Sequence, residues 1–441
     1  MITQHAWMFL SSFEKLRSKL LMLDTVNMAH LGARAFEEIG GEVVQTASFV
    51  MRKSRENGYK GVYCRLIEPT SQKGKEDMFL AGDNQYEAVQ DNFAKIPGSP
   101  VAYWVSHKLL NVFLDSKSLA EISEPKVGLQ SGNNNKYYKL WTEISIDNIT
   151  FDGNKAGKWY PCVKGGESRK WFGNQTYVIN WENDGKDIKE ETSAVVRNST
   201  CYFKGGLTWT KINSVFAVRY FPDNMILSDS SVYIFPEMKE YVLGCLNSII
   251  APKIVEMLNP TLNFVASTIG SIPILIKKNN DITKLVKDNI IISKDDWNDF
   301  ETSWDFLKHP FLKCASFSIQ DMMEDEKRYI RDQNYIKDAY TRWSNECFCR
   351  FKQLKANEEE LNRIFIAIYG LQDELTPEVE DKDVTVRKAD LGRDIRSFIS
   401  YAVGCMFGRY SIDKDGLMVA GQPFESVYFE ATAPRAGTGV A

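Results

Sequence analysis

Histidine is scarce in this 441-residue sequence, and long apolar runs are missing. The four histidines are far apart, and none forms a recognisable nucleophile motif with a serine or cysteine. Apolar runs such as 265–276 are interrupted by polar residues and by Pro273, so we expect no membrane span. The eight cysteines follow no regular framework, which favours reduced thiols in a cytoplasmic protein.

Metal-binding patterns are also missing. Cys347 and Cys349 form a single C-x-C without a second pair or a nearby histidine. Because zinc sites use four ligands at recognisable spacing, we expect packed cysteines and no metal site. The consecutive glutamates 358–360 point around a helix instead of at one ion, so a solvated helix face is expected there.

Sequence motifs for a bound cofactor are absent too. We find no G-x-G-x-x-G, no phosphate-binding P-loop and no H-E-x-x-H. A DNA amino-methyltransferase needs a glycine-rich loop for S-adenosylmethionine and a polar-Pro-Pro-aromatic tetrapeptide for the target base. The one Asn-Pro step, Asn259-Pro260, lacks the second proline and the aromatic residue. We therefore expect this chain alone to be inactive and to bind no cofactor.

The composition is that of a globular protein of two or three domains, with 44% hydrophobic and 25% charged residues. Its net charge is -4, so any nucleic-acid binding must come from a local patch. Residues 136–220 provide one, with 13 Lys+Arg against 9 Asp+Glu and five of the ten tryptophans. Because cations attract phosphates and Asn, Gln and Arg read base edges, we expect an exposed cationic, aromatic face that binds double-stranded DNA.

The densest part of this region reads KWYPCVKGGESRKWFGNQTYVINWEN, residues 158–183. Its two adjacent glycines would let backbone amides approach a phosphate, although a plain hairpin turn would look the same. Expected phosphate contacts are Lys158, Lys164, Gly165, Gly166, Arg169, Lys170, Arg197, Lys204 and Arg219, and expected base readers are Asn174, Asn180 and Asn183. For Trp159, Trp171 and Trp181 we favour core packing over stacking on DNA.

The periodicity predicts an α/β and α+β multidomain chain. Residues 1–53 have the pattern of the last third of an α/β domain, with a helix around 13–21 and a strand over 43–51. We expect a linker or insertion over 54–125, a mixed α+β recognition domain over 126–280 with one helix at 239–258 and a strand near 272–274, and a helical spacer over 281–375. A last helix near 390–407 and a disordered tail are expected within 376–441.

Long blocks of the sequence resemble one family. They read WMFLSSFEKLR, HLGARAFEEIGGEVVQTASFVMRK, KGGESRKWFGNQTYVINWENDG, LNPTLNF with IGSIPIL, DWNDFETSWDF, NEEELNRIF with IYGLQDELTPEVE, and IRSFISYAVGCMFGRYS. They are similar to the PglX family, the adenine-specific DNA methyltransferases of BREX phage-defence systems, which are relatives of type IIG restriction-modification enzymes. The resemblance covers most of residues 1–420.

The resemblance implies a parent enzyme that transfers a methyl group from S-adenosyl-L-methionine to the N6 atom of adenine at a specific DNA site. This chain would be its C-terminal portion, truncated at both ends, with residues 1–53 as the tail end of the Rossmann-like methyltransferase sheet. Its partners would be the missing N-terminal methyltransferase portion, double-stranded DNA and other phage-defence proteins. Phe36 would stack on the flipped base, unless it is an ordinary core residue. The loop 128–136 resembles a Gly/Asn loop near DNA in relatives, which adds Gln130, Asn133, Asn134 and Lys136 to the candidates, although a solvated turn would look identical.

Two rival interpretations stay open. A stand-alone DNA-binding subunit would resemble the specificity subunits of type I restriction systems, whose recognition-domain endings are similar to LNPTLNF and IGSIPIL. Against it, residues 1–53 make sense as methyltransferase sheet and poorly as an independent start. The other rival is a degraded gene product without function.

Overall fold

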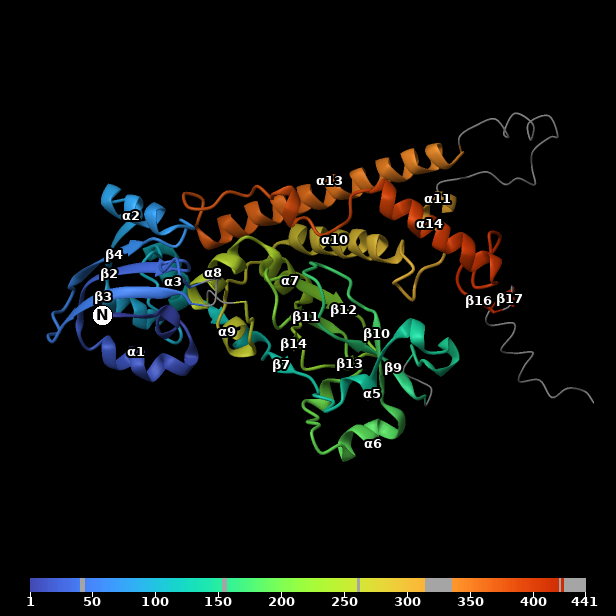
Figure 1. Ribbon diagram of the computed structural model, residues 1–441, viewed down its shortest axis with the longest axis horizontal. Helices are drawn as coiled ribbons and strands as arrows, with labels where there is room; N and C mark the ends of the chain where they lie inside the picture. Colours follow the sequence, from blue (N-terminus) through green and yellow to red (C-terminus); the bar gives the residue numbers. More distant parts are fainter. Residues whose placement is uncertain (40–43, 153–156, 260–261, 314–334, 420–421, 424–441) are drawn as a thin grey trace, which may run out of the picture.

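The computed structural model describes residues 1–39, 44–152, 157–259, 262–313, 335–419 and 422–423. It is a mixed α/β structure with several sheets (Figure 1). A five-stranded sheet stands at one end, two four-stranded sheets extend from the middle toward the other end, and long helices run along one side. The expected tail lies mostly outside the described residues.

The five-stranded sheet has the order β1-β3-β2-β4-β5. Only β2 and β4 are parallel, and the other pairs are antiparallel. Its strands are β1 (Ile2–Gln4), β2 (Asp24–Gly32), β3 (Thr46–Arg52), β4 (Lys60–Arg65) and β5 (Gln85–Val89). The helices around it are η1 (His5–Met8), η2 (Ser11–Phe13), α1 (Glu14–Leu20), α2 (Gln72–Ala81), η3 (Gln90–Lys95) and α3 (His107–Asp115).

Two expectations about this first part need correction. The sheet does not stop at residue 53, because β4 and β5 lie in the segment that was read as a linker and pair alongside β2. The predicted helix forms as α1, but its inner face is not apolar. Arg17 is 1% exposed, whereas Phe13 and Leu16 are exposed at 38% and 43%. The Arg17 guanidinium donates to the carbonyls of Trp7, Leu10 and Gly98, so hydrogen bonds compensate its burial.

The two four-stranded sheets form the middle of the chain. One has the order β13-β9-β10-β8 and the other β12-β11-β14-β7. Their strands are β7 (Lys126–Val127), β8 (Tyr138–Leu140), β9 (Trp159–Val163), β10 (Tyr177–Asn180), β11 (Gly206–Thr210), β12 (Val218–Phe221), β13 (Ile226–Leu227) and β14 (Ser231–Ile234). Short helices connect them: α5 (Asn134–Tyr137), η4 (Trp141–Glu143), η5 (Ile146–Asn148), α6 (Glu182–Glu190) and η6 (Ser199–Cys201).

The single helix predicted for 239–258 is two helices, α7 (Lys239–Asn247) and α8 (Ile250–Leu258), bent by 69°. Asn247 ends α7, and its side chain bonds both the amide and the carbonyl of Val218 at 2.9 Å, which competes with a continuous helix. The predicted strand is β15 (Pro273–Ile274), paired with β6 (Lys117–Ser118); α4 (Leu119–Ile122) and α9 (Ala266–Gly270) lie nearby. Residues 260–261 of the predicted turn lie outside the described residues.

The described residues of 281–375 are mostly helical, and a last helix lies near 390–407, as the sequence periodicity predicts. This part of the chain holds α10 (Asn280–Asn298), α11 (Pro310–Lys313), α13 (Tyr335–Tyr369), η8 (Asp381–Asp383) and α14 (Leu391–Met406), followed by β16 (Met418–Val419) and β17 (Gln422–Pro423). The sequence spacing predicts one helix face for Phe351, Leu354, Leu361, Phe365 and Ile368; the first four are buried on α13, and Ile368 is half-buried. Gly370 follows α13 with φ +69°, the left-handed conformation typical of a helix end.

One large apolar core joins β11, β12 and β14 to helices α7, α8, α10 and α13. The five-stranded sheet has a separate core around Met8, Phe49 and Tyr63. No single helix of the described ranges is both long and apolar enough to cross a membrane, and only the bent α7–α8 pair, taken together, passes that test of length and composition.

Candidate nucleic-acid interface

Loops at one end of the two four-stranded sheets lie side by side. The backbones of Gln130 and Val195 bond each other in both directions, at 2.9 and 2.8 Å. The amide of Asp229 donates to the carbonyl of Leu129 at 2.9 Å. These bonds bring the Gly/Asn loop, the segment before Arg197 and the β13–β14 connection to one place.

The Gly165-Gly166 pair joins the same group. The amide of Gly165 donates to Ser230 Oγ at 2.9 Å, and the amide of Gly166 to Thr210 Oγ1 at 3.4 Å. Asn213 Nδ2 donates to the carbonyl of Gly166 at 3.2 Å. We call this surface the loop edge; it consists of residues 128–136, 164–166, 195–197, 210–213 and 228–230.

Lys164 is the cation at the centre of the loop edge. Its Nζ lies 4.4 Å from the ring centroid of Tyr138 and 4.5 Å from that of Tyr177. The two rings hold the ammonium by cation–π attraction, and none of the ion pairs within the described residues involves it. Lys164 is therefore available to an incoming anion.

Several candidate residues of the Gly/Asn loop use some of their polar atoms in hydrogen bonds within the protein. Asn133 Oδ1 accepts from the amide of Lys136 and caps α5, and Asn134 Oδ1 accepts from Ser131 Oγ. Lys136 Nζ donates to the phenol of its neighbour Tyr137 and lies 3.8 Å from Glu191. Gln130, Asn133, Asn134 and Lys136 are nevertheless exposed, so their remaining donors face solvent.

Other predicted residues lie elsewhere. Lys158 and Lys164 bracket the five residues of β9, and the extended chain holds them roughly 20 Å apart. Asn180 pairs with Trp159 at the Lys158 end, and Asn183 begins α6 just beyond it. Lys204 precedes β11, whose other end reaches the loop edge at Thr210. These four residues do not share a surface with Lys164.

Asn174 stays near the loop edge but is committed to local structure. Its φ is +60°, and its Nδ2 donates to the carbonyl of Glu167 at 2.8 Å. A Cβ on Gly166 would approach Asn174 Nδ2 to 2.8 Å, so a side chain at this glycine would collide with the turn.

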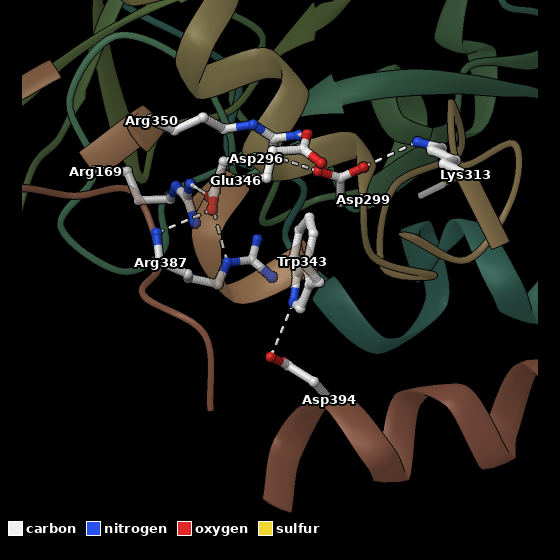
Figure 2. Close-up of polar contacts among 9 residues, drawn as sticks. All are labelled: Arg169, Asp296, Asp299, Lys313, Trp343, Glu346, Arg350, Arg387 and Asp394. Carbon is white, nitrogen blue, oxygen red and sulfur yellow. Dashed lines mark hydrogen bonds and ion pairs between the residues drawn. The ribbon is translucent and has the colours of Figure 1, made fainter. Parts of the chain in front are cut away.

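Arg169 faces the helices instead of solvent. Figure 2 shows its guanidinium beside Asp296 of α10, where Arg169 Nη2 lies 2.6 Å from Asp296 Oδ2. The backbone amide of Arg387 donates to the other oxygen of Asp296 at 2.9 Å, and Arg387 Nε lies 3.4 Å from Oδ2. One buried carboxylate thus serves two arginines from distant parts of the chain.

Lys170 and Trp171 make a second contact of this kind. Lys170 Nζ lies 2.9 Å from one oxygen of Glu358 on α13, and Trp171 Nε1 donates to the other oxygen at 2.7 Å. Glu358 is 2% exposed, so the solvated face expected for it is wrong. We call Arg169, Lys170, Trp171, Asp296, Glu358 and Arg387 the junction network, because it ties the sheets to α10 and α13.

The network continues along the helices. Figure 2 shows Asp299 between Lys313, at 2.9 Å, and Arg350, which also pairs with Glu346. Trp343 Nε1 donates to Asp394 Oδ2 at 3.0 Å, which fastens α14 to α13. The buried carboxylates of Asp299 and Asp394 thus each have partners on a neighbouring part of the chain, and loss of those partners would leave a buried charge uncompensated.

The expectation of a continuous, exposed cationic face over 136–220 is wrong. Arg169 and Arg219 are buried, and carboxylates neutralise Lys158 and Lys170. Arg197 and Lys204 are exposed. What stays together at the loop edge is a smaller set: Gln130, Asn133, Asn134, Lys136, Lys164, Gly165, Gly166 and Arg197.

The tryptophans are core residues, as favoured from the sequence. Trp159, Trp171 and Trp181 are 9%, 0% and 3% exposed. Phe36 is 40% exposed in the β2–β3 connection, so it is not an ordinary core residue. The sheet that carries it stands at the opposite end of the molecule from β9 and β10 (Figure 1).

Sequence reasoning missed Thr210, Asn213 and Ser230, which complete the loop edge. They belong to the β11–β12 and β13–β14 connections, where small polar residues are typical of any loop. Only strand pairing brings them to the Gly165-Gly166 pair, so no local signal in the sequence could have selected them.

Metal ligands do not converge among the described residues: no group of three His, Cys, Asp or Glu side chains could hold an ion. A pocket of about 310 Å³ lies at the carboxyl ends of the parallel strands β2 and β4. Its lining is mainly apolar, and the buried Lys75 beneath it donates to the carbonyls of Leu31 and Leu66 at 2.7 Å. Burial lowers the pKa of Lys75.

No protein-family model matches the chain. Two solved structures are similar to it at low identity: the type IIL restriction-modification enzyme MmeI in complex with DNA and a nuclease-deletion mutant of the type ISP enzyme LlaGI with a DNA substrate mimic. For MmeI the identity is 10%, the TM-score is 0.49, and 92% of this chain and 49% of that chain are covered. For LlaGI the values are 11%, 0.37, 66% and 34%.

Two curated proteins match at much higher identity. The adenine-specific methyltransferase PglX of Lacticaseibacillus casei (strain Zhang) is 41% identical over 458 residues, which cover 99% of this chain and 37% of PglX. The adenine-specific methyltransferase BrxX of Escherichia coli O9:H4 (strain HS) is 34% identical over 442 residues, which cover 95% of this chain and 35% of BrxX. The chain is therefore homologous to a segment of the PglX and BrxX adenine-specific methyltransferases, and it spans a little over a third of the length of either protein.

Proposed function

We propose that this chain is the DNA-recognising part of a site-specific adenine-N6 DNA methyltransferase of a phage-defence or restriction-modification system. The observation that carries the proposal is the 41% identity to PglX along 99% of the chain. At that identity the fold and the general role of a segment are normally kept. The unmatched two thirds of the relatives would supply the cofactor loop and the base-gripping tetrapeptide that this sequence lacks.

The loop edge is the surface that we propose to face duplex DNA. Lys164 supplies a cation without a carboxylate partner, and the Gly165-Gly166 pair exposes backbone to close approach. Gln130 and Arg197 stand beside them with side chains that can read base edges or phosphates. Lys158, Asn180, Asn183 and Lys204 lie away from this edge, so any contact that they make would be separate from it.

Duplex binding tests the proposal. Fluorescence anisotropy with a labelled duplex should give an affinity that falls steeply as salt rises from 50 to 200 mM, because bound phosphates release counterions. The charge variant Lys164→Gln should weaken binding, and Lys158→Gln, at the far end of β9, is the matched control. Salt-independent binding, or none, would contradict phosphate contacts by this surface.

The cofactor is a separate question. S-adenosyl-L-methionine would belong to the parent enzyme, and titration calorimetry on this chain alone should give no heat with it. Tight binding would mean that a pocket here, such as the one above Lys75, takes the cofactor after all.

A further inference from the structure

Arg219 is a charged residue inside the sheets. It lies on β12, is 1% exposed, and points to the same side of the strand as Phe221, toward the core shared with Tyr233. Its strand neighbours Val218 and Tyr220 pack on the opposite side, against the helices. A guanidinium in this position has lost nearly all its water, so its charge must be compensated by the protein or by a ligand.

The protein compensates it poorly. Within the described residues, both terminal nitrogens of Arg219 reach only Thr210 Oγ1, at the long distances of 3.5 and 3.4 Å. No carboxylate of the described part of the chain forms an ion pair with it; burial lowers the pKa of Arg219 most, the phenol of Tyr233 raises this pKa, and the neighbouring cation Arg169 lowers it further. By contrast, the equally buried Arg17 donates to three different backbone carbonyls.

Burial lowers the pKa of Arg219 to about 10, so the side chain still carries its charge at neutral pH. A full positive charge therefore lies in a region of low dielectric, where solvent and salt screen it weakly. Among the described residues, the hydroxyl of Thr210 is the one side-chain hydrogen-bond partner of this guanidinium.

Thr210 lies between the Arg219 guanidinium and the surface of the loop edge. Thr210 Oγ1 covers the guanidinium on one side and, on the other, exchanges contacts with the amide and the carbonyl of Gly166 at 3.4 and 3.3 Å. Gly166 is exposed and has no side chain, and Asn213 bonds the same carbonyl. Arg219 is thus one residue below the surface of the loop edge.

We infer that Arg219 is the buried counter-charge of an oxyanion site at Gly166, Thr210 and Asn213, which takes a phosphodiester group of the DNA backbone. This inference rests on the proposed function for the identity of the phosphate. On binding, the Thr210 hydroxyl, the Gly166 amide and the Asn213 carboxamide would exchange their contacts with one another for contacts with phosphate oxygens. The cation beneath them would add to the attraction of Lys164.

Replacement of the charge by an apolar side chain of similar length tests the site. Arg219→Met should melt no lower than the natural protein, because it removes an uncompensated buried charge. Its affinity for duplex DNA should fall about tenfold, the loss of one charge-assisted contact, and the slope of log K against log salt should become shallower by about one unit. Arg219→Lys should keep most of the slope.

Inorganic phosphate gives a second readout that needs no DNA. Millimolar phosphate should raise the melting temperature of the natural protein and of the control Lys158→Met, but not that of Arg219→Met. A shift without DNA binding would keep the anion site and reject the proposed function. No phosphate shift, with DNA binding unchanged in Arg219→Met, would overturn the site alone, and an Arg219→Met variant that unfolds would show that the guanidinium only holds the sheets together.

Discussion

His5 and His30 are buried against each other, with Nδ1 of His5 2.8 Å from Nε2 of His30, whose Nδ1 lies 3.2 Å from the Tyr103 hydroxyl. Burial lowers the pKa of His5 to about 4 and that of His30 to about 3, and the cations Arg65 and Lys75 add to the shift of His30. Both pKa values lie below the unfolded value of 6.5, so the unfolded chain binds more protons than the folded one below that pH.

The free energy of unfolding should therefore be fully developed above pH 6.5 and should fall as the pH drops from 6.5 toward 4. Each histidine contributes up to about 1.4 kcal/mol per pH unit in that window. Urea unfolding at pH 7 and pH 5 measures the change. His30→Leu should be less stable at pH 7, but its free energy of unfolding should fall less between pH 7 and pH 5. The control His107→Asn, at an exposed histidine, should lose as much free energy of unfolding as the natural protein. An equal loss in His30→Leu would refute this assignment.

Asp296 is the residue whose removal should cost most. Asp296→Asn leaves the buried Arg169 and the half-buried Arg387 without their carboxylate, and breaking a buried pair costs about 3 to 5 kcal/mol. Thermal and urea unfolding should both show it. The control is Asp77→Asn, which breaks the exposed pair with Lys73 and should change nothing measurable. Comparable losses in the two variants would mean that the buried carboxylate has no special role.

At the scale of single elements, the turn after Trp171 depends on a glycine. Gly173 has φ +130°, and a Cβ there would lie 2.8 Å from Arg169 Nε and 3.1 Å from the Trp297 ring. Gly173→Ala should lower the free energy of unfolding by about 2 to 3 kcal/mol through backbone strain and collision together. Gly58→Ala separates backbone strain from collision, because Gly58 has φ +72° but an added Cβ would meet nothing within 4 Å. If both variants lose the same free energy of unfolding, the collision with Arg169 does not contribute.

The elements also show what a sequence can and cannot predict. The face of α13 and its end at Gly370 follow from 3.6-residue periodicity and a left-handed glycine, both of which are local. The loop edge, the junction network and the break between α7 and α8 depend on partners 29 to 215 residues away, such as Asn247 with Val218 and Lys170 with Thr385. Charge counting also misjudged Arg169, because a cation looks the same in sequence whether it meets DNA or Asp296.

Across the whole molecule, the separate cores predict separate unfolding. The sheets β11, β12 and β14 share one core with α10 and α13, whereas β1–β5 surround another and are tied to α8 by the Arg65–Glu256 pair at 2.6 Å. Hydrogen exchange at low urea should open β2–β4 independently of β11 and α10, which should open together. Exchange of all these peptides at one rate would exclude separate units, and Asp296→Asn should loosen β12 from α10 without affecting β2.

The junction network has a consequence for engineering. A recognition module exchanged between two homologues would carry its own counterparts of Arg169, Lys170 and Trp171 into a helical framework that supplies Asp296 and Glu358. A graft whose boundaries follow the sheets alone would leave buried charges of the junction network without their partners. We expect chimeras to fold when they carry all residues of the junction network from one homologue, or when substitutions restore its ion pairs.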